Sequence, residues 1–359
     1  MNYRQLSKEI LFITSNDGSD MRINKEIRSL AEEGSSIYFL GVASDEDNCF
    51  VKEYCKEVVL IKGPRNSVRS IAGLIYASIK ILFHREINNI HIINEQLMIF
   101  FYPILFFRHT VLDLFDSLFL KLNKPGDDWS LLKKIVYFPV DTILVTDERR
   151  LQLMPTFSRK YCKILPNYPY KRNSSSRELK KGPLCILFNG WMGLNRGTEI
   201  AEGLLQTGLP IKIIMAGWFS DEHTRKLPSI YPDQISFRGV VPQEIALQWA
   251  EKEADYILCV YAPINTNNIN ASPNKVYDAI QTGTPLIANA ETAVSNLISK
   301  LNVGYVLDEY AVKDFTVLYH KLVEKRNSFH WDHSLREHFS WENCQNELLS
   351  AHGLAVHPR

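Results

Sequence analysis

The sequence predicts an α/β protein made of two domains, each built on a parallel sheet. At 359 residues the chain is long enough for two such domains, each with its own core. Short apolar runs typical of buried strands alternate with helical patterns in both halves of the chain. A polar stretch without apolar periodicity separates the halves. Because a strand, a helix and a further strand in succession form a βαβ unit, we expect parallel pairing in each domain.

The first half begins with a strand over Ile10–Thr14. Ile23, Ile27 and Leu30 then repeat with helical spacing, and Gly34 ends that helix. Further strands are predicted over Ile37–Val42, Ile90–Asn94, Val111–Leu114 and Thr142–Val145. These elements predict a first domain over residues 1–168.

The stretch over residues 169–182 is rich in Ser and basic residues, which indicates an interdomain linker. The strand and helix alternation then restarts, which predicts a second domain over residues 183–329. Its elements are expected at Leu184–Phe188, Glu199–Leu205, Ile211–Ala216, Ile235–Gly239, Gln243–Lys252, Tyr256–Val260 and Leu286–Asn289, with a further helix that follows Ser272. Residues 330–359 form a tail of helical composition.

Composition limits the classes of function. The formal net charge is +1 and no long basic stripe is present, which argues against nucleic acid as a partner. Six cysteines are scattered without CxxC spacing, as free thiols are in a reducing cytosol. The N-terminus has no signal-peptide layout, and no apolar run reaches the ~20 residues needed to span a bilayer. We therefore expect a cytoplasmic protein.

The most informative segment is Ser272–Pro285, with the sequence SPNKVYDAIQTGTP. Ser272 followed by Pro273 is typical of an N-cap and a first helical position. Gly283 suits the left-handed residue just after a helix, and the proline after it stops the helix from continuing. A short helix is therefore expected to begin in a polar loop and to present its first N–H groups to a ligand.

The polar residues of this helix share one face. Lys275, Asp278 and Thr282 fall at i, i+3 and i+7, whereas Val276 and Ile280 share another face. A cation and a carboxylate near a positive helix end suit a ligand that has both phosphates and hydroxyls. The alternative is an ordinary amphipathic helix whose polar residues are solvated.

A glycine-rich loop, NGWMGLNRG over Asn189–Gly197, joins a predicted strand to a helix. Gly190 and Gly193 allow close backbone approach, and Arg196 stands before a helix whose N–H groups suit phosphate oxygens. An arginine there adds charge-assisted bonds to a diphosphate. Glycine-rich turns between strand and helix are common, so this loop indicates a phosphate site only in combination with the SPNKVYD segment downstream.

Together these motifs resemble those of the retaining GT-B glycosyltransferases, family four in the sequence classification. The resemblance implies a GT-B fold of two Rossmann-like domains with a cleft between them, in which a terminal helix returns to the first domain. It implies Arg196 and Lys275 as the catalytic residues. It also implies a donor site made of Gly190, Gly193, Gly197, Asn270, Ser272, Asn274 and Asp278.

Three positions depart from the family pattern. Trp191 stands where the family has an arginine, so one phosphate contact is missing. Asn270 and Asp278 replace two glutamates, and Asn270 is equally well explained as a residue of a polar loop. Phe115 replaces a histidine, so no histidine role is carried over, and we interpret His109 as structural.

The resemblance also implies an acceptor site in the first domain. Asp17 and Asp20 lie in the segment DGSDMR between strand and helix, and Asp116 follows a predicted strand. The structural alternative for the first pair is an Asx turn and an N-cap. The acidic run Asp45–Asp47 could suggest a metal site, but a solvated acidic loop explains it and we expect no metal and no cofactor.

We therefore expect transfer of a sugar from a nucleotide sugar to a saccharide or lipid-linked acceptor, with retention, in bacterial surface polysaccharide or glycoconjugate synthesis. A GT-B nucleotide-sugar epimerase and a non-catalytic sugar-nucleotide-binding protein remain as alternatives. The apolar segments Val68–Phe83 and Leu97–Phe107, the first flanked by basic residues, suggest contact with the inner face of the plasma membrane. The alternative is that both are core helices.

Overall fold

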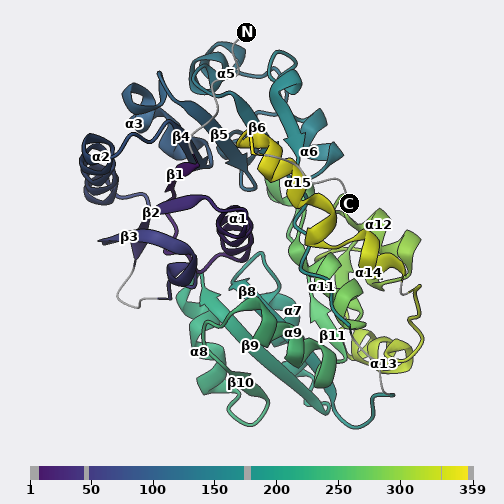
Figure 1. The fold of residues 1–359 in the computed structure, drawn as a ribbon. Helices are drawn as coiled ribbons and strands as arrows, with labels where there is room; N and C mark the ends of the chain where they lie inside the picture. Colours follow the sequence, from purple (N-terminus) through teal and green to yellow (C-terminus); the bar gives the residue numbers. More distant parts are fainter. Residues whose placement is uncertain (1–7, 44–47, 174–178, 333, 355–359) are drawn as a thin grey trace. The chain divides into compact units, whose positions relative to one another are not determined.

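A computed structural model describes residues 8–43, 48–173, 179–332 and 334–354 (Figure 1). The chain forms two compact units: Met1–Pro166 with Cys344–Arg359, and Asn167–Asn343. The described residues of the predicted linker, and residues 330–343 of the predicted tail, therefore belong to the second unit. The C-terminal helix α15 (Trp341–Ala351) enters the first unit at Cys344.

The first unit contains a seven-stranded parallel sheet in the order β3-β2-β1-β4-β5-β6-β7. Its strands are β1 (Glu9–Ile13), β2 (Ser36–Ala43), β3 (Cys55–Lys62), β4 (Asn89–Ile93), β5 (His109–Leu114), β6 (Thr142–Val145) and β7 (Cys162–Ile164). The order reverses between β1 and β4. Chain segments that leave these two strands therefore move to opposite faces of the sheet.

Among the described residues, the α-helices between these strands are α1 (Met21–Glu32), α2 (Val68–His84), α3 (Glu95–Leu105), α4 (Leu118–Lys121), α5 (Ser130–Tyr137) and α6 (Glu148–Gln152). Single 3-10 turns lie at Lys52–Tyr54 and Arg159–Tyr161. The inner faces of α2, α3 and α5 form one core with the sheet, through residues such as Leu74, Met98 and Val136. The helical repeat Ile23, Ile27 and Leu30 on α1 is fully buried.

The second unit contains a six-stranded parallel sheet in the order β10-β9-β8-β11-β12-β13. Its strands are β8 (Leu184–Met192), β9 (Ile211–Phe219), β10 (Ile235–Phe237), β11 (Tyr256–Leu258), β12 (Leu286–Asn289) and β13 (Gly304–Leu307). Here the order reverses between β8 and β11.

Helices cover both faces of the second sheet. They are α7 (Thr198–Gln206), α8 (Glu222–Ile230), α9 (Gln243–Lys252), α10 (Thr266–Ile269), α11 (Asn274–Thr282), α12 (Ser295–Leu301), α13 (Phe315–Lys325) and α14 (Ser334–His338). Leu204 of α7 and Leu322 of α13 lie in the core on one face. Val276 and Ile280 of α11 lie in the core on the other face. The predicted assignment of these two residues to the core is confirmed.

Most predicted elements are present, and β6, α9 and β12 have the predicted bounds. Several others were not predicted from the sequence: β3, α8, α10, α12, β13 and α13. Strand β3 is an edge strand whose residues are half-buried or exposed, so it lacks the apolar run of a central strand. Among the described residues, the helices are too short or too polar to cross a bilayer. The six cysteines are free thiols.

Candidate functional site

The clearest candidate site lies at the point where the order of the second sheet reverses. In open α/β sheets, ligands bind outside the carboxyl ends of the strands at such a point. The chain leaving β8 enters α7 on one face, and the segment after β11 leads to α11 on the other. The two motifs singled out in the sequence are therefore brought to the same edge of the sheet.

Glycines in the loop after β8 serve different purposes. A Cβ on Gly193 would lie 1.7 Å from Ser220 Oγ, and one on Gly197 would lie 2.9 Å from side-chain atoms of Leu258 and Val260. These two glycines are thus required by packing within the protein. Gly190 has φ +85° and its Cβ position is open, so it is the glycine of this loop that leaves room for a ligand.

The amides of this loop are already engaged. The N–H groups of Arg196 and Thr198 donate to the Gly193 carbonyl. Side-chain acceptors take the amides of Leu194 (Asp221 Oδ2, 2.8 Å), Asn195 (Glu199 Oε1, 2.8 Å) and Gly197 (Tyr310 Oη, 3.2 Å). Five successive amides therefore bond within the protein. The expectation that N–H groups at this helix start take phosphate oxygens does not hold for these five.

Arg196 remains available for an anion. Its guanidinium carbon lies 4.8 Å from the centre of the Tyr261 ring, and its side chain is half-buried. Tyr261 follows β11, and the Ala262 amide after it donates to the Asn195 carbonyl at 3.0 Å. Stacking on an aromatic face holds an arginine in place while its edge N–H groups remain directed outward.

Lys275 approaches the same point from α11. Its Nζ donates to the Leu258 carbonyl at 2.8 Å and lies 5.9 Å from the centre of the Phe188 ring. Burial lowers the pKa of Lys275, and the positive charge of Arg196 lowers it further, against the opposing effects of Cys259 and Asp278. Two cations thus act on each other at the carboxyl edge of the sheet, and a bound anion would relieve their repulsion.

Asp278 lies behind these cations. It is buried, and its Oδ1 accepts from Gln243 Nε2 at 2.7 Å. The neighbouring thiol of Cys259 has its pKa raised to about 12, chiefly by burial, and Lys275, Asp278 and Arg196 all act on it electrostatically. The three charged groups therefore surround one point at the end of β11.

The structure corrects the predicted start of the helix. Pro273 is the N-cap and α11 begins at Asn274, one residue later than predicted, because Pro273 has an extended ψ of 136°. The alternative of a solvated polar face does not hold for Asp278 and Thr282, which are both buried, and Thr282 Oγ1 donates to the Asp278 carbonyl. The prediction of a left-handed Gly283 is confirmed, with φ 75°.

The loop before α11 is fixed from one side. The Ser272 carbonyl accepts from Asn167 Nδ2 at 3.0 Å, and Asn274 is half-buried. Asn270 ends the unpredicted helix α10 as its C-cap, and its Nδ2 donates to the Thr266 carbonyl at 3.0 Å. This bond is a local structural role for Asn270, and a donor role for it stays a prediction.

The three acceptor candidates lie beyond the carboxyl ends of β1 and β5 in the first unit, and each has a local partner. Asp17 accepts from the Ser19 amide in an Asx turn, and Arg65 Nη2 lies 3.5 Å from its Oδ1. Asp20 is the N-cap of α1 and accepts from the amides of the next turn. Asp116 forms an ion pair with Lys121. The structural alternative is thus observed for Asp17 and Asp20.

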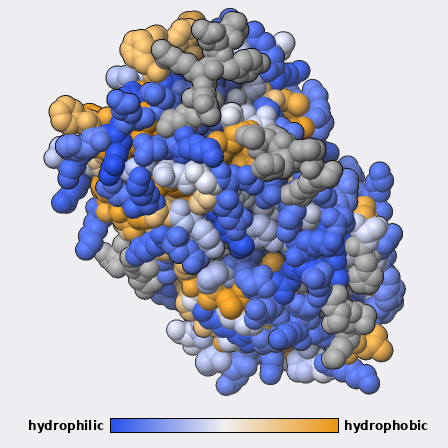
Figure 2. Space-filling model, viewed as in Figure 1, coloured by the Kyte–Doolittle hydropathy of each residue, from blue (hydrophilic) through white to orange (hydrophobic). Residues whose placement is uncertain are grey.

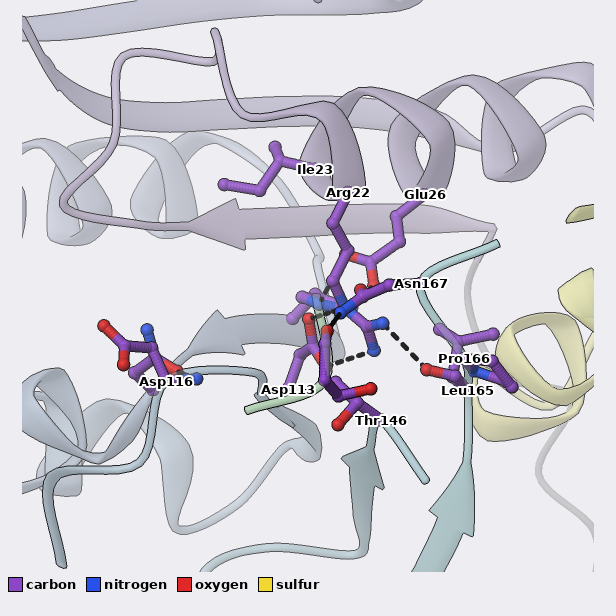
Figure 3. A network of polar contacts seen from close by, with 12 residues as sticks. Arg22, Ile23, Glu26, Asp113, Asp116, Thr146, Leu165, Pro166 and Asn167 are labelled. Carbon is purple, nitrogen blue, oxygen red and sulfur yellow. Dashed lines mark hydrogen bonds and ion pairs between the residues drawn. The ribbon is translucent and has the colours of Figure 1, made fainter. Parts of the chain in front are cut away.

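The first unit also contains a buried polar network (Figure 3). Arg22 of α1 donates to both oxygens of Asp113 on β5, at 2.7 and 2.6 Å, and to the Leu165 carbonyl at 2.8 Å. Glu26 lies one turn further along α1, with Oε1 3.1 Å from Arg22 Nε. Burial raises the pKa of Glu26 well above its ordinary value, and the negative charge of Asp113 adds to this.

Histidines extend this network to the C-terminal end of the chain. His91 Nε2 lies 3.4 Å from Glu26 Oε2, and His91 Nδ1 lies 3.0 Å from His352 Nε2. His352 Nδ1 in turn lies 2.8 Å from Asn89 Oδ1. Burial lowers the pKa of both histidines, so both are neutral near pH 7. His109 bonds the Ala351 carbonyl at 2.7 Å, in keeping with the structural role predicted for it.

Within the described ranges, one cluster could offer three ligand atoms to a metal: Glu26, His91 and Asp113, whose atoms lie within 4.8 Å of one another. Arg22 already neutralises Asp113 at hydrogen-bond distance, and a second cation beside it would be repelled. The cluster therefore fits an arginine better than a metal. The acidic run Asp45–Asp47 lies outside the described residues.

Sequence reasoning missed several residues around the candidate site. Tyr261 lies in the segment that follows the buried strand β11, and Gln243 opens a helix after Pro242, so their positions near element ends were available signals. Glu199 and Tyr310, which hold the loop, gave no such signal. They meet through a 2.6 Å bond between α7 and the segment after β13, a contact that depends on tertiary structure.

No family profile and no curated protein sequence matches the chain. Its structure is similar to that of sucrose-phosphate synthase from Thermosynechococcus elongatus, with TM-score 0.63 and 12% identity over 96% of this chain and 94% of that one. It is also similar to HepE from Anabaena in complex with UDP and glucose, with TM-score 0.63 and 11% identity over 96% and 95%.

The lipopolysaccharide outer core galactosyltransferase WaaB, in its apo form, gives TM-score 0.57 and 12% identity over 95% of this chain and 99% of that one. At such low identities these similarities concern the fold. Together with the two parallel sheets, they confirm the predicted GT-B fold of two Rossmann-like domains.

Proposed function

We propose that this protein is a glycosyltransferase that takes its sugar from a nucleotide sugar bound by the second unit. The observation that carries the proposal is the meeting of Arg196 and Lys275 at the reversal point of the second sheet, with Asp278 buried behind them. A diphosphate supplies the negative charge that two interacting cations favour. The GT-B fold shared with HepE, whose structure holds UDP and glucose, supports the same assignment.

The proposed chemistry is electrostatic. Negative charge grows on the leaving diphosphate as the glycosidic bond breaks, and Arg196 and Lys275 stabilise it. The N-terminal end of α11 adds positive potential through the helix dipole. In this proposal Asp278 accepts hydrogen bonds from the ribose hydroxyls and Gly190 leaves room for the donor. In this proposal the two cations neutralise the diphosphate charge, which a metal ion does in other transferases. Transfer proceeds with retention of configuration.

We further propose that the first unit binds the acceptor, a saccharide or a lipid-linked saccharide, at the carboxyl edge of its sheet. Asp17, Asp20 and Asp116 are the acceptor candidates there. The reaction class suits synthesis of a bacterial surface polysaccharide or glycoconjugate on the inner face of the plasma membrane. Local bonds of these three carboxylates leave them fixed in place, as acceptor-binding groups need to be.

A thermal-shift screen against UDP, GDP, ADP and CMP sugars tests the donor assignment, since a ligand that binds the folded state raises its melting temperature. We expect one nucleotide class to raise it and Arg196→Ala to reduce turnover more than affinity, because the diphosphate charge is greatest in the transition state. Arg225→Ala is the matched control, because Arg225 is an exposed arginine of α8 whose described contacts are with Glu222 and the Phe219 ring.

Product analysis separates the alternatives. A transferase releases the nucleoside diphosphate only when an acceptor is used or water replaces it, whereas an epimerase changes the sugar and keeps the nucleotide sugar intact. If no nucleotide sugar shifts the melting temperature, or if Arg196→Ala and Arg225→Ala behave alike, the donor assignment is wrong.

A further inference from the structure

Three helices on one face of the first sheet have apolar side chains on both sides. The inner sides of α2, α3 and α5 enter the core, and α3 lies between the other two and contacts both. Their outer sides are also largely apolar. Figure 2 shows hydrophobic side chains along the upper left margin, where Figure 1 places these helices. We call this outer surface the α2–α3–α5 surface.

On α2 the outward residues form a second apolar stripe. Leu74 and Ile81 are buried, whereas Tyr76, Ile79 and Phe83 are 72%, 54% and 85% exposed. The exposed positions follow helical spacing, i, i+3 and i+7, so they lie on one face. A helix that is apolar all round is normally enclosed by protein or lipid.

The stripe continues on the neighbouring helices. Phe107, just after α3, is 86% exposed, and Leu131 on α5 is 76% exposed. Phe106 joins the two helices, since its ring centre lies 5.2 Å from that of Phe107 and 5.7 Å from that of Phe138 after α5. Scattered exposed apolar residues are normal, but a continuous set on adjacent helices marks an interaction surface.

The charges on these helices have one sign. Their only acidic residue is Glu95, which is buried and accepts from Ser117 and Tyr137. The exposed charged residues are cationic: Arg69 and Lys80 on α2 and Lys134 on α5. Two copies of such a surface would repel each other, whereas an anionic surface would be attracted.

We propose that the α2–α3–α5 surface docks on an anionic lipid bilayer, with its aromatic side chains in the interface and its cations at the headgroups. In this proposal the helices lie along the membrane surface, because their exposed apolar side chains are on their outer sides. This inference assigns a docking surface to the membrane location named under the proposed function, and it involves neither the donor site nor the transfer step.

Flotation of the full chain on sucrose gradients tests the proposal. We expect it to rise with vesicles of mixed phosphatidylglycerol and phosphatidylcholine at low salt, and to rise less with phosphatidylcholine alone or at high salt. Phe83→Ser/Phe107→Ser should lower the partition coefficient by about tenfold or more, because two phenyl rings no longer enter the interface. Lys80→Glu/Lys134→Glu should abolish the preference for phosphatidylglycerol.

The matched control is Ile230→Ser/Ile264→Ser, which removes two apolar side chains, 54% and 58% exposed, from the second unit. It should float like the wild type, and all variants should keep the wild-type melting temperature. Absence of flotation by the wild type, or equal loss in the control, overturns the proposal. So does a wild-type dimer that Phe83→Ser/Phe107→Ser converts to a monomer, because the surface would then join two copies.

Discussion

Replacing Arg22 by methionine should strongly destabilise the first unit. The guanidinium makes two bonds to Asp113 and one to the Leu165 carbonyl, and its side chain is buried. Methionine fills similar space and removes all three bonds. It leaves the Asp113 carboxylate fully buried beside Glu26 without its cation.

Removing one partner of a buried ion pair typically costs about 3–5 kcal/mol, because the other charge stays buried and uncompensated. A domain has a free energy of unfolding of about 5–15 kcal/mol, so Arg22→Met should remove about a fifth of it or more. Arg22→Met/Asp113→Leu removes both charges and should recover most of the loss. The coupling between the two positions should exceed about 2 kcal/mol.

Urea unfolding followed by circular dichroism measures these free energies for the two single variants and the double variant. If Arg22→Met unfolds within about 1 kcal/mol of the wild type and the double variant is the least stable, the ion pair does not hold the unit together.

Four other results are expected. Asp278→Ala should weaken nucleotide binding about tenfold to a hundredfold in calorimetry, because a charged hydrogen bond contributes about 1.5–3 kcal/mol; unchanged affinity would remove Asp278 from the site. A bound diphosphate should raise the lowered pKa of Lys275. Donor binding should therefore take up protons and should weaken as pH rises through that pKa. Calorimetry in two buffers of different ionisation enthalpy measures the proton uptake. Ile280→Ala should lower the free energy of unfolding by about 2–5 kcal/mol through a cavity, without changing ligand specificity. Burial lowers the pKa of His352 to about 3, so below about pH 6.5 the unfolded chain takes up a proton that the folded state does not. The stability present above pH 6.5 should therefore be lost on acidification, by roughly 2 kcal/mol at pH 5. Urea titrations of His352→Gln should show a free energy of unfolding that depends less on pH.

Much of the fold could be predicted because parallel strands buried on both faces form compact apolar runs. Thr142–Val145 and Leu286–Asn289 are such strands, and their bounds are those expected. Elements at the margins were missed for a physical reason. β3 and β13 are edge strands, each with a single neighbour, so their residues need not be apolar on both faces.

The charged residues of the candidate site could be predicted from the sequence, whereas most of the hydrogen bonds around them could not. Helix phase indicated Lys275 and Asp278, and the glycine pattern indicated Arg196. The bonds of Tyr310 to Gly197 and Glu199 could not be foreseen, because they join segments over a hundred residues apart. Nor could burial of Asp278 be foreseen, since it depends on Gln243 of α9 packing against α11.

These bonds change which groups could act on a diphosphate. With the five amides from Leu194 to Thr198 already engaged, the loop contributes shape and the side chain of Arg196 rather than a ring of N–H donors. Tyr310 donates to the carboxylate of Glu199 at 2.6 Å while accepting from Gly197, so it fixes the turn that carries Arg196. Any anion bound there would therefore depend on the charges of Arg196 and Lys275, supplied from opposite faces of the sheet, and on the N-terminal end of α11. The reversal of strand order determines where such a site lies, and the spacing of residues along the sequence predicts only some of its groups.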